Sequence, residues 1–585
     1  MAYDIFTLGV PDEWPLRLLH IPSMTSIERR DGDMYREDHQ PRYAIISYTW
    51  GRYELPDGPR IQIFGIDWPI PAIDPKHFTV GDLTHLLNRI GQNYDYIWID
   101  IACIDQKRHA LKMKEIGRQA SIFKCASQAY VWLNSHQVDV LAESMQKLLQ
   151  CGWDASNDED KDAAQVAEEM SGALSVILQD RWFSSLWTLQ ESILQRHSLF
   201  LNKRGGPVET HGPWTGESLW TQVLDLSGAC KMVRDFLDRA IVTFHGSDGP
   251  SDSNDYLHKL QQLRTAIDHS GIDFELCPNP NIAYAAARFR QTTRAEDRIY
   301  AIMQVYGYQL GESAPSSAQS SEGFALVDLE LQFLQALNAQ SCLISQAFQH
   351  LHVPQQGQSW AFTNAIRVPQ RLHTIIAQEQ FVSSGSYVVN IVQRAEAYFI
   401  AKSWSFKFVL GFLHQRAQGF IAQLEERVDV PLDLKGRAAF FDRSRILKVA
   451  KQGIIADASD QYDCESISIE WPLDTTAYND RNEPLIECRT PELHTAALKL
   501  QGIGARLIGV FGEDKVRVLY LGRTKYIETM ELGLIVVREK QTTGKFLRWK
   551  KHVWRRIGLC FWHWDRYDDV GDLEANLAPM KGRFG

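Results

Sequence analysis

Several features are scarce or missing in this chain of 585 residues, and each absence excludes a class of protein. Its nine cysteines lie scattered between Cys103 and Cys560 with no C-x-x-C pair, which argues against a disulfide framework and a zinc module. No run of about eighteen apolar residues is present, so no transmembrane segment is expected. Asp4, Asp12 and Glu13 occupy the stretch where a secretory signal would be basic and then apolar. We therefore expect a cytoplasmic protein.

Glycine-rich nucleotide motifs are missing too. There is no G-x-G-x-x-G after an early strand and no G-x-x-x-x-G-K-S/T, so neither a Rossmann hydride-transfer site nor a P-loop is expected. The formal net charge of -10 gives no overall attraction to phosphate backbones or anionic lipid. We therefore expect no bound cofactor or metal ion.

The composition is that of a folded, soluble protein, with 44% hydrophobic and 23% charged residues. Such a length exceeds one ordinary hydrophobic core, so several domains are expected. From changes of pattern along the chain we predict an N-terminal arm (1–42), an α/β domain (43–200), a helical extension (201–310), a linker or mobile loop (311–323) and a C-terminal α+β region (324–585).

Strand and helix patterns alternate within the predicted α/β domain. Residues 43–47, 96–99 and 129–133 are apolar runs of strand length, and segments with helical spacing separate them. Continuous apolar runs are typical of strands that are buried on both faces. This alternation predicts a parallel sheet, whose strands all end at one shared edge.

Polar and aromatic side chains follow these strands. Ser47 ends the first run, Trp50 and Gly51 come just after it, and Asp100 and Ser135 follow the next two. Ligands bind at the carboxyl edge of open α/β sheets, so these residues are expected to gather at a site. Trp50 is suited to stack on a ring, and Asp100 to accept hydrogen bonds from sugar hydroxyls. Each residue also has a structural alternative: Trp50 as a core indole, Asp100 as the cap of a turn, and Ser47 as a buried hydroxyl whose hydrogen bonds are satisfied.

Glu191 has two interpretations. The run Thr188-Leu-Gln-Glu191 fits a capping box, in which Thr188 caps a helix and Glu191 returns the hydrogen bond. Alternatively, Glu191 is a catalytic carboxylate near the sheet edge. Trp98 and Trp187 lie in apolar periodic runs, so we interpret both as core aromatics.

Three sequence blocks together resemble a known family. They are Tyr43-Ala-Ile-Ile-Ser-Tyr-Thr-Trp-Gly51, Trp98-Ile-Asp-Ile-Ala-Cys-Ile-Asp-Gln106 and Arg181-Trp-Phe-Ser-Ser-Leu-Trp-Thr-Leu-Gln-Glu191. In order and approximate spacing they resemble the fungal heterokaryon incompatibility (HET) domain. The chain departs from the family pattern at Ser185, where these domains usually carry a second Arg, and at Asp105.

The resemblance has implications for fold and activity. HET domains are remotely similar to TIR domains, whose enzymatic members cleave NAD with a Glu four residues after a Trp. The resemblance therefore implies a TIR-like parallel-sheet α/β domain with helical insertions, followed by helical and α+β regions. The implied catalytic residue is Glu191, and the implied substrate-binding residues are Ser47, Trp50, Gly51, Asp100, Ser185 and Trp187.

In function, the resemblance implies a heterokaryon-incompatibility or immune-type effector of programmed cell death. Such an effector would self-associate on activation, take NAD as its candidate substrate and answer to an unknown protein partner. The alternative is a non-enzymatic death-signalling or scaffold module that acts through self-assembly.

A basic segment at residues 538–556 stands apart from these blocks. Its Lys and Arg residues surround Trp549 and Trp554, which suits a groove for nucleic acid or acidic lipid. In a chain this acidic we favour the alternative, a solvated strand face with extended basic side chains.

Overall fold

The computed structural model describes most of the chain up to residue 350 and shorter ranges beyond it. The described residues are 11–50, 54–55, 57–135, 138–157, 162–212, 216–244, 253–272, 279–314, 323–341, 343–350, 358–363, 365–368, 372, 388–393, 396–409, 418–424, 430–431, 438–439, 512–523, 530–540, 552–563 and 576–584. The chain divides into two compact units, residues 1–241 with 250–333 and residues 242–249 with 334–585.

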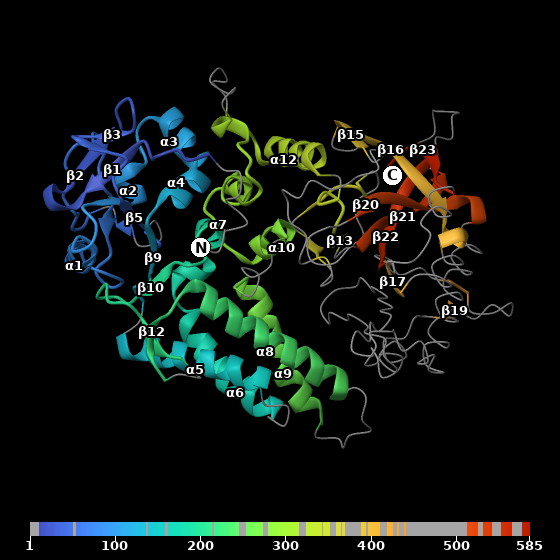
Figure 1. Ribbon diagram of the computed structural model, residues 1–585, viewed down its shortest axis with the longest axis horizontal. Helices are drawn as coiled ribbons and strands as arrows, with labels where there is room; N and C mark the ends of the chain where they lie inside the picture. Colours follow the sequence, from blue (N-terminus) through green and yellow to red (C-terminus); the bar gives the residue numbers. More distant parts are fainter. Residues whose placement is uncertain are drawn as a thin grey trace, which may run out of the picture. The chain divides into compact units, whose positions relative to one another are not determined.

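The first unit is built on a six-stranded sheet (Figure 1). In spatial order its strands are β10 (Leu199–Leu201), β9 (Gln128–Trp132), β5 (Tyr43–Ser47), β8 (Tyr96–Trp98), β1 (Arg17–His20) and β2 (Thr25–Glu28). The pairs from β10 to β8 are parallel, whereas β1 pairs antiparallel with both β8 and β2. The predicted α/β class with a parallel sheet is confirmed. Part of the segment expected as an N-terminal arm supplies β1 and β2.

Burial on both faces explains the continuous apolar runs of these strands. All five residues of β5 are buried. In β9, Tyr130 and Trp132 pack into one hydrophobic core, whereas the alternate residue Val131, and Leu133 just beyond the strand, pack into another. Side chains alternate between the faces of a strand, so two cores require an apolar residue at every position.

Helices connect the parallel strands. They are α1 (Val80–Ile90) between β5 and β8; α2 (Asp100–Cys103), α3 (His109–Ile116) and α4 (Gln119–Cys125) between β8 and β9; and α5 (Val138–Asn157), α6 (Ala163–Ile177), the 3-10 turn η4 (Arg181–Ser184) and α7 (Leu186–Leu194) between β9 and β10. A capping box begins α1, in which Thr79 and Asp82 exchange hydrogen bonds. Its buried residues Leu83, Leu86, Leu87 and Ile90 recur at helical spacing.

Gly117 and Arg118 separate the two helices α3 and α4. Gly117 caps the end of α3, and a Cβ at this position would lie 2.9 Å from the Ser313 side chain. A larger residue would therefore force the later segment away from this turn.

A helical layer forms the second core of this unit. In Figure 1, α5 and α6 lie beside α8 (Val223–Phe244) and α9 (Ser253–Ser270). Shorter elements follow: α10 (Pro280–Ala286), α11 (Asp297–Tyr300) and the 3-10 turn η7 (Met303–Tyr306). Of the linker predicted at 311–323, residues 315–322 lie outside the described residues, and α12 (Leu326–Gln340) comes after it.

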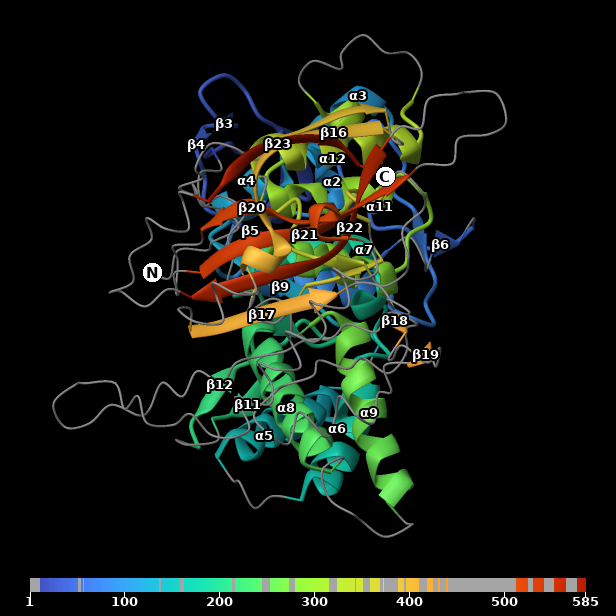
Figure 2. The same ribbon diagram turned by 90° about the vertical axis from the view of Figure 1, so that its right-hand side faces the viewer.

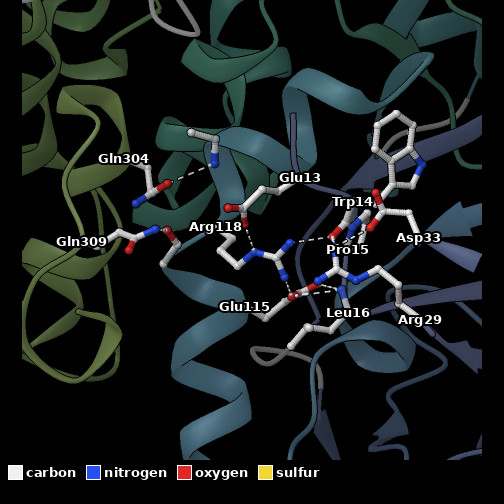
Figure 3. Close-up of polar contacts among 12 residues, drawn as sticks. Glu13, Trp14, Pro15, Leu16, Arg29, Asp33, Glu115, Arg118, Gln304 and Gln309 are labelled. Atoms are coloured by element: carbon white, nitrogen blue, oxygen red, sulfur yellow. Dashed lines mark hydrogen bonds and ion pairs between the residues drawn. The ribbon is translucent and has the colours of Figure 1, made fainter. Parts of the chain in front are cut away.

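A buried ion pair ties the start of the chain to α3 (Figure 3). Glu115 is 1% exposed and accepts a hydrogen bond of 3.0 Å from the Leu16 backbone N–H. It also accepts one of 3.3 Å from Trp98 Nε1. Arg118 lies 3.5 Å from Glu115 and 2.7 Å from the Glu13 carboxylate. Burial raises the pKa of Glu115 to about 7, and the Arg118 charge opposes that rise. Residues 13–16 are thereby held against the domain.

The second unit contains a seven-stranded sheet, whose strands run across the view in Figure 2. The strands are β15 (Val388–Gln393), β16 (Glu396–Ser405), β20 (Val516–Arg523), β21 (Met530–Lys540), β22 (His552–His563) and β17 (Gln418–Leu424), with β23 (Ala578–Arg583) beside β16. Every pairing within it is antiparallel.

Arg556 in the basic segment is buried, contrary to both interpretations of that segment. Its side chain is 0% exposed, lies over the Phe348 ring at 4.0 Å and donates a hydrogen bond of 3.1 Å to Gln346 Oε1. A guanidinium held in this way packs the second unit. Residues 541–551 lie outside the described residues. Within the described ranges, no helix is both long and apolar enough to cross a membrane.

Candidate functional site

Ser47 links the end of β5 to the segment around α7. The residue is 3% exposed, and its hydroxyl donates a hydrogen bond of 2.5 Å to Glu191 Oε2. The same hydroxyl accepts a hydrogen bond of 2.7 Å from Trp182 Nε1. An indole, a hydroxyl and a carboxylate therefore form a chain of hydrogen bonds at the carboxyl edge of the parallel sheet. This chain fixes the position of the Glu191 carboxylate.

The capping-box interpretation of Glu191 is wrong. Helix α7 begins after Ser185, so Thr188 lies inside the helix and donates to the backbone carbonyls of Trp182 and Ser185. The first amide of α7, that of Leu186, donates to the Gln291 carbonyl at 3.0 Å. Because α7 begins three residues earlier than this capping box would require, Glu191 lies in the second turn of the helix, where its carboxylate contacts Ser47.

Trp187 and Glu191 form the accessible stripe of α7. The other seven residues of this helix of nine are buried, whereas these two are partly exposed. Their spacing of four puts them on one helix face. Trp187 Nε1 donates a hydrogen bond of 3.3 Å to Asp297. The prediction that Trp187 is a core aromatic is therefore wrong. The same prediction for Trp98 is confirmed, because that residue is 2% exposed.

A second carboxylate lies at the same edge. Asp100 begins α2 directly after β8, and its Oδ1 accepts hydrogen bonds of 2.7 Å from the Tyr48 hydroxyl and from the Ile101 amide. Tyr48 follows Ser47 in the chain, so the two carboxylates are held by consecutive residues of the segment leaving β5. Asp100 is also partly exposed.

The electrostatics of the two carboxylates are coupled. Burial raises the pKa of Glu191 to about 8; the Ser47 hydrogen bond opposes this rise and the Asp100 charge adds to it. Burial also raises the pKa of Asp100, against the hydrogen bonds from Tyr48 and Ile101. Both shifts mean that negative charge is poorly stabilised here. A positively charged group placed beside these carboxylates would be stabilised.

The remaining predicted site residues have varied positions. Trp50 is 6% exposed and packs edge-on against Tyr48 and Phe78, with ring centroids 6.1 Å and 5.6 Å apart. Ser185 precedes α7, and its side chain makes no capping hydrogen bond. Gly51 lies outside the described residues.

Ser135 lies at the same edge of the sheet, where β9 ends. Its backbone N–H donates a hydrogen bond of 3.0 Å to Asp180 Oδ2. The other oxygen of Asp180 accepts from the Trp182 amide at 2.9 Å. Asp180 thus joins the end of β9 to the turn that carries the Trp182 indole.

Two hydrogen-bond donors of the site were not identified from the sequence, although both belong to the blocks that carried the family resemblance. Trp182 supplies the indole N–H to Ser47, and Tyr48 supplies the hydroxyl to Asp100. The available signal was an aromatic residue with a polar tip inside an apolar run, because such tips find partners when they are buried.

Neither a metal site nor a reactive thiol emerges in the part of the chain that the structure describes. Among the described residues, no group of three or more His, Cys, Asp or Glu side chains is placed to hold a metal ion. Cys103 is buried, and burial raises the pKa of its thiol to about 12. Such a thiol is a core residue.

Comparison with known families agrees with the site geometry. Residues 43–191 match the family model described as heterokaryon incompatibility protein (HET). The chain contains a HET domain. The matched segment runs from the first residue of β5 to Glu191, so it includes every residue of the hydrogen-bonded chain at the sheet edge. The HET domain supports a role in heterokaryon incompatibility. No curated protein and no solved structure matches the chain.

Proposed function

We propose that this HET domain is a TIR-like effector of a self/non-self or immune-type cell-death response, and that it cleaves NAD at the bond between nicotinamide and ribose. The observation that carries the proposal is the position of Glu191. It does not cap α7; it accepts a hydrogen bond from Ser47 at the sheet edge and shares the accessible stripe of α7 with Trp187.

The chemistry requires one carboxylate. When the bond from ribose C1′ to the ring nitrogen breaks, its electron pair goes to that nitrogen, and nicotinamide leaves as a neutral molecule. Positive charge develops on the ribose, and the Glu191 carboxylate stabilises it, as carboxylates do in glycosidases. Water then adds its oxygen to C1′ and releases one proton. The products are nicotinamide and ADP-ribose.

The charge of the substrate suits the electrostatics of the site. With a pKa of about 8, Glu191 carries a proton for most of the time at neutral pH. The nicotinamide ring of NAD is positively charged, so its arrival beside Glu191 would favour the carboxylate form. Asp100 adds negative charge at the same place. Binding of the substrate would therefore convert Glu191 to its active form with loss of a proton.

Other parts of the proposal rest on the resemblance to TIR domains. They are self-association on activation, regulation by an unknown protein partner, and action in the cytoplasm. In this scheme Trp187 offers a ring face to the substrate, and Ser47 positions Glu191 without touching the reacting bond.

Release of nicotinamide by the purified full chain tests the proposal, measured alone and under crowding. A Glu191→Gln variant should lose activity by about 100-fold or more, because the amide cannot stabilise the positive charge. Glu168→Gln is the matched control, since Glu168 is exposed on α6. Equal activity of the Glu191→Gln variant and the wild type would refute the assignment.

A non-enzymatic scaffold that acts by self-assembly is the second candidate. Leu219 and Trp220 on β12 (Ser218–Trp220) are 53% and 55% exposed, as expected for a surface that docks another protein. On this alternative, toxicity in cells survives Glu191→Gln but is lost with Leu219→Ser and Trp220→Ser together. On the enzymatic proposal, Glu191→Gln abolishes toxicity.

A further inference from the structure

Three residues at the edge of the parallel sheet bury polar atoms that have no hydrogen-bond partner among the residues that the structure describes. They are the Thr49 hydroxyl, the Trp50 indole N–H and both side-chain atoms of the Asn134 amide. Thr49 is 7% exposed, Trp50 6% and Asn134 0%. A buried polar group without a partner lowers the stability of the folded state. Native proteins keep few such groups, and each one requires an explanation.

These atoms lie on both sides of the point where the strand order reverses. In space the parallel strands run β8, β5, β9 and β10, while in sequence β5 comes first, then β8, β9 and β10. After β5, the chain therefore adds β8 on one side of that strand and later adds β9 on its other side. Ligands of open α/β sheets bind at such a reversal, outside the carboxyl ends of the strands.

The three residues follow two neighbouring parallel strands. Ser47, the last residue of β5, pairs with Val131 of β9, so the strand that precedes Thr49 and Trp50 and the strand that precedes Asn134 end beside each other at this edge. Two independent observations, the unpartnered polar atoms and the reversal of strand order, thus coincide between β5 and β9.

We infer that Thr49, Trp50 and Asn134 form a hydrogen-bonding subsite for a neutral polar group of the ligand. The inference rests on the proposed function and extends it. In that function the charged nicotinamide ring of NAD lies beside Glu191, and this subsite would hold a neutral part of the same molecule. The indole N–H only donates hydrogen bonds, whereas the amide and the hydroxyl both donate and accept them. A sugar diol or a primary carboxamide offers the complementary set.

The charges of the site exclude a phosphate as the preferred group. None of the three side chains carries a charge, and burial already disfavours negative charge on Glu191 and Asp100 at the same edge. An anion would be repelled there without a cation to compensate. The diphosphate of a dinucleotide would therefore lie elsewhere, and the subsite would take the ribose or the carboxamide.

Asn134→Leu tests the inference, because leucine has a similar size and no polar atoms. The free variant should melt at the same or a higher temperature than its parent, since an unpartnered amide is removed. Its affinity for the ligand should fall about tenfold or more, which corresponds to one lost hydrogen bond. Thr49→Val is the second variant with the same two expectations, and Asn88→Leu on the exposed face of α1 is the control.

Binding is measured by thermal shift of the full chain in a Glu191→Gln background, so that NAD is not consumed. The probes are NAD, ADP-ribose and nicotinamide, each at millimolar concentration. Loss of the ADP-ribose shift identifies the ribose as the bound group, and loss of the nicotinamide shift identifies the carboxamide. The inference is overturned if no probe binds, if every probe binds both chains equally, or if Asn134→Leu lowers the melting temperature by several degrees.

Failure of the subsite and failure of the proposed function are separate outcomes. A chain that binds ADP-ribose through Asn134 but releases no nicotinamide supports the subsite and refutes the hydrolase. A wild-type background that hydrolyses NAD with the same KM after Asn134→Leu supports the hydrolase and refutes the subsite.

Discussion

Ser47 and Glu191 lie 144 positions apart in the sequence, and the hydroxyl of the first donates a hydrogen bond to the carboxylate of the second. Trp182 donates to the same hydroxyl, so one strand end and the segment around α7 hold the carboxylate together. A carboxylate held in this way responds to each of its neighbours. The pKa of Glu191 is therefore the quantity through which the site can be tested.

The activity of the wild-type chain should rise with pH. Glu191 acts as a carboxylate, and its pKa in the free protein is raised to about 8. We expect kcat/KM for NAD to increase as pH rises through about 8, because this ratio reports ionisation in the free enzyme. The kcat profile should have its midpoint at lower pH, since the cationic substrate favours the carboxylate. A flat profile between pH 6 and pH 9 would contradict this assignment.

Removing the Ser47 hydroxyl should move this profile upwards. The Ser47 hydrogen bond lowers the pKa of Glu191, so Ser47→Ala raises it further. We expect the midpoint of kcat/KM to shift to higher pH, with reduced activity at neutral pH. Ser175→Ala, on the exposed face of α6, should leave the midpoint unchanged. A shift to lower pH would show that the hydroxyl does not stabilise the carboxylate.

Neutralising Asp100 should have the opposite effect on the midpoint. The negative charge of Asp100 raises the pKa of Glu191, so Asp100→Asn lowers it. The kcat/KM midpoint should then move to lower pH than in the wild type. Opposite shifts in the two variants would distinguish electrostatic control of Glu191 from general damage to the fold, which would lower activity without moving the midpoint.

Loss of Glu115 should destabilise the first unit. The Arg118 guanidinium is 5% exposed, and without Glu115 it keeps only its contacts with residues 13–14. Removing one partner of a buried ion pair costs about 3 kcal/mol or more. We expect urea unfolding of Glu115→Ala to show this loss. Glu13→Ala, whose carboxylate is 49% exposed, should lose about 1 kcal/mol or less. Equal losses of unfolding free energy in the two variants would contradict the greater cost that we expect for removing the buried carboxylate.

The sequence by itself determined the parallel sheet and the residues at its edge. The strand at 43–47 and the positions of Ser47 and Asp100 follow from apolar periodicity, which is set by neighbours within a few residues. Because all parallel strands end at one edge, the order of strands and helices along the chain is enough to group the residues that follow each strand. The same local logic identified α1 by the spacing of its leucines.

Only the tertiary structure decided what these residues contact. The sequence around Glu191 fits a capping box, but α7 begins three residues earlier, at Leu186, and the Glu191 carboxylate accepts a hydrogen bond from Ser47. Nor does any local pattern indicate that Arg556 is buried against Phe348. Such contacts join residues that are far apart in the chain, and packing selects them after the local elements have formed. Local patterns fix the elements, whereas the partners of their side chains depend on how those elements meet.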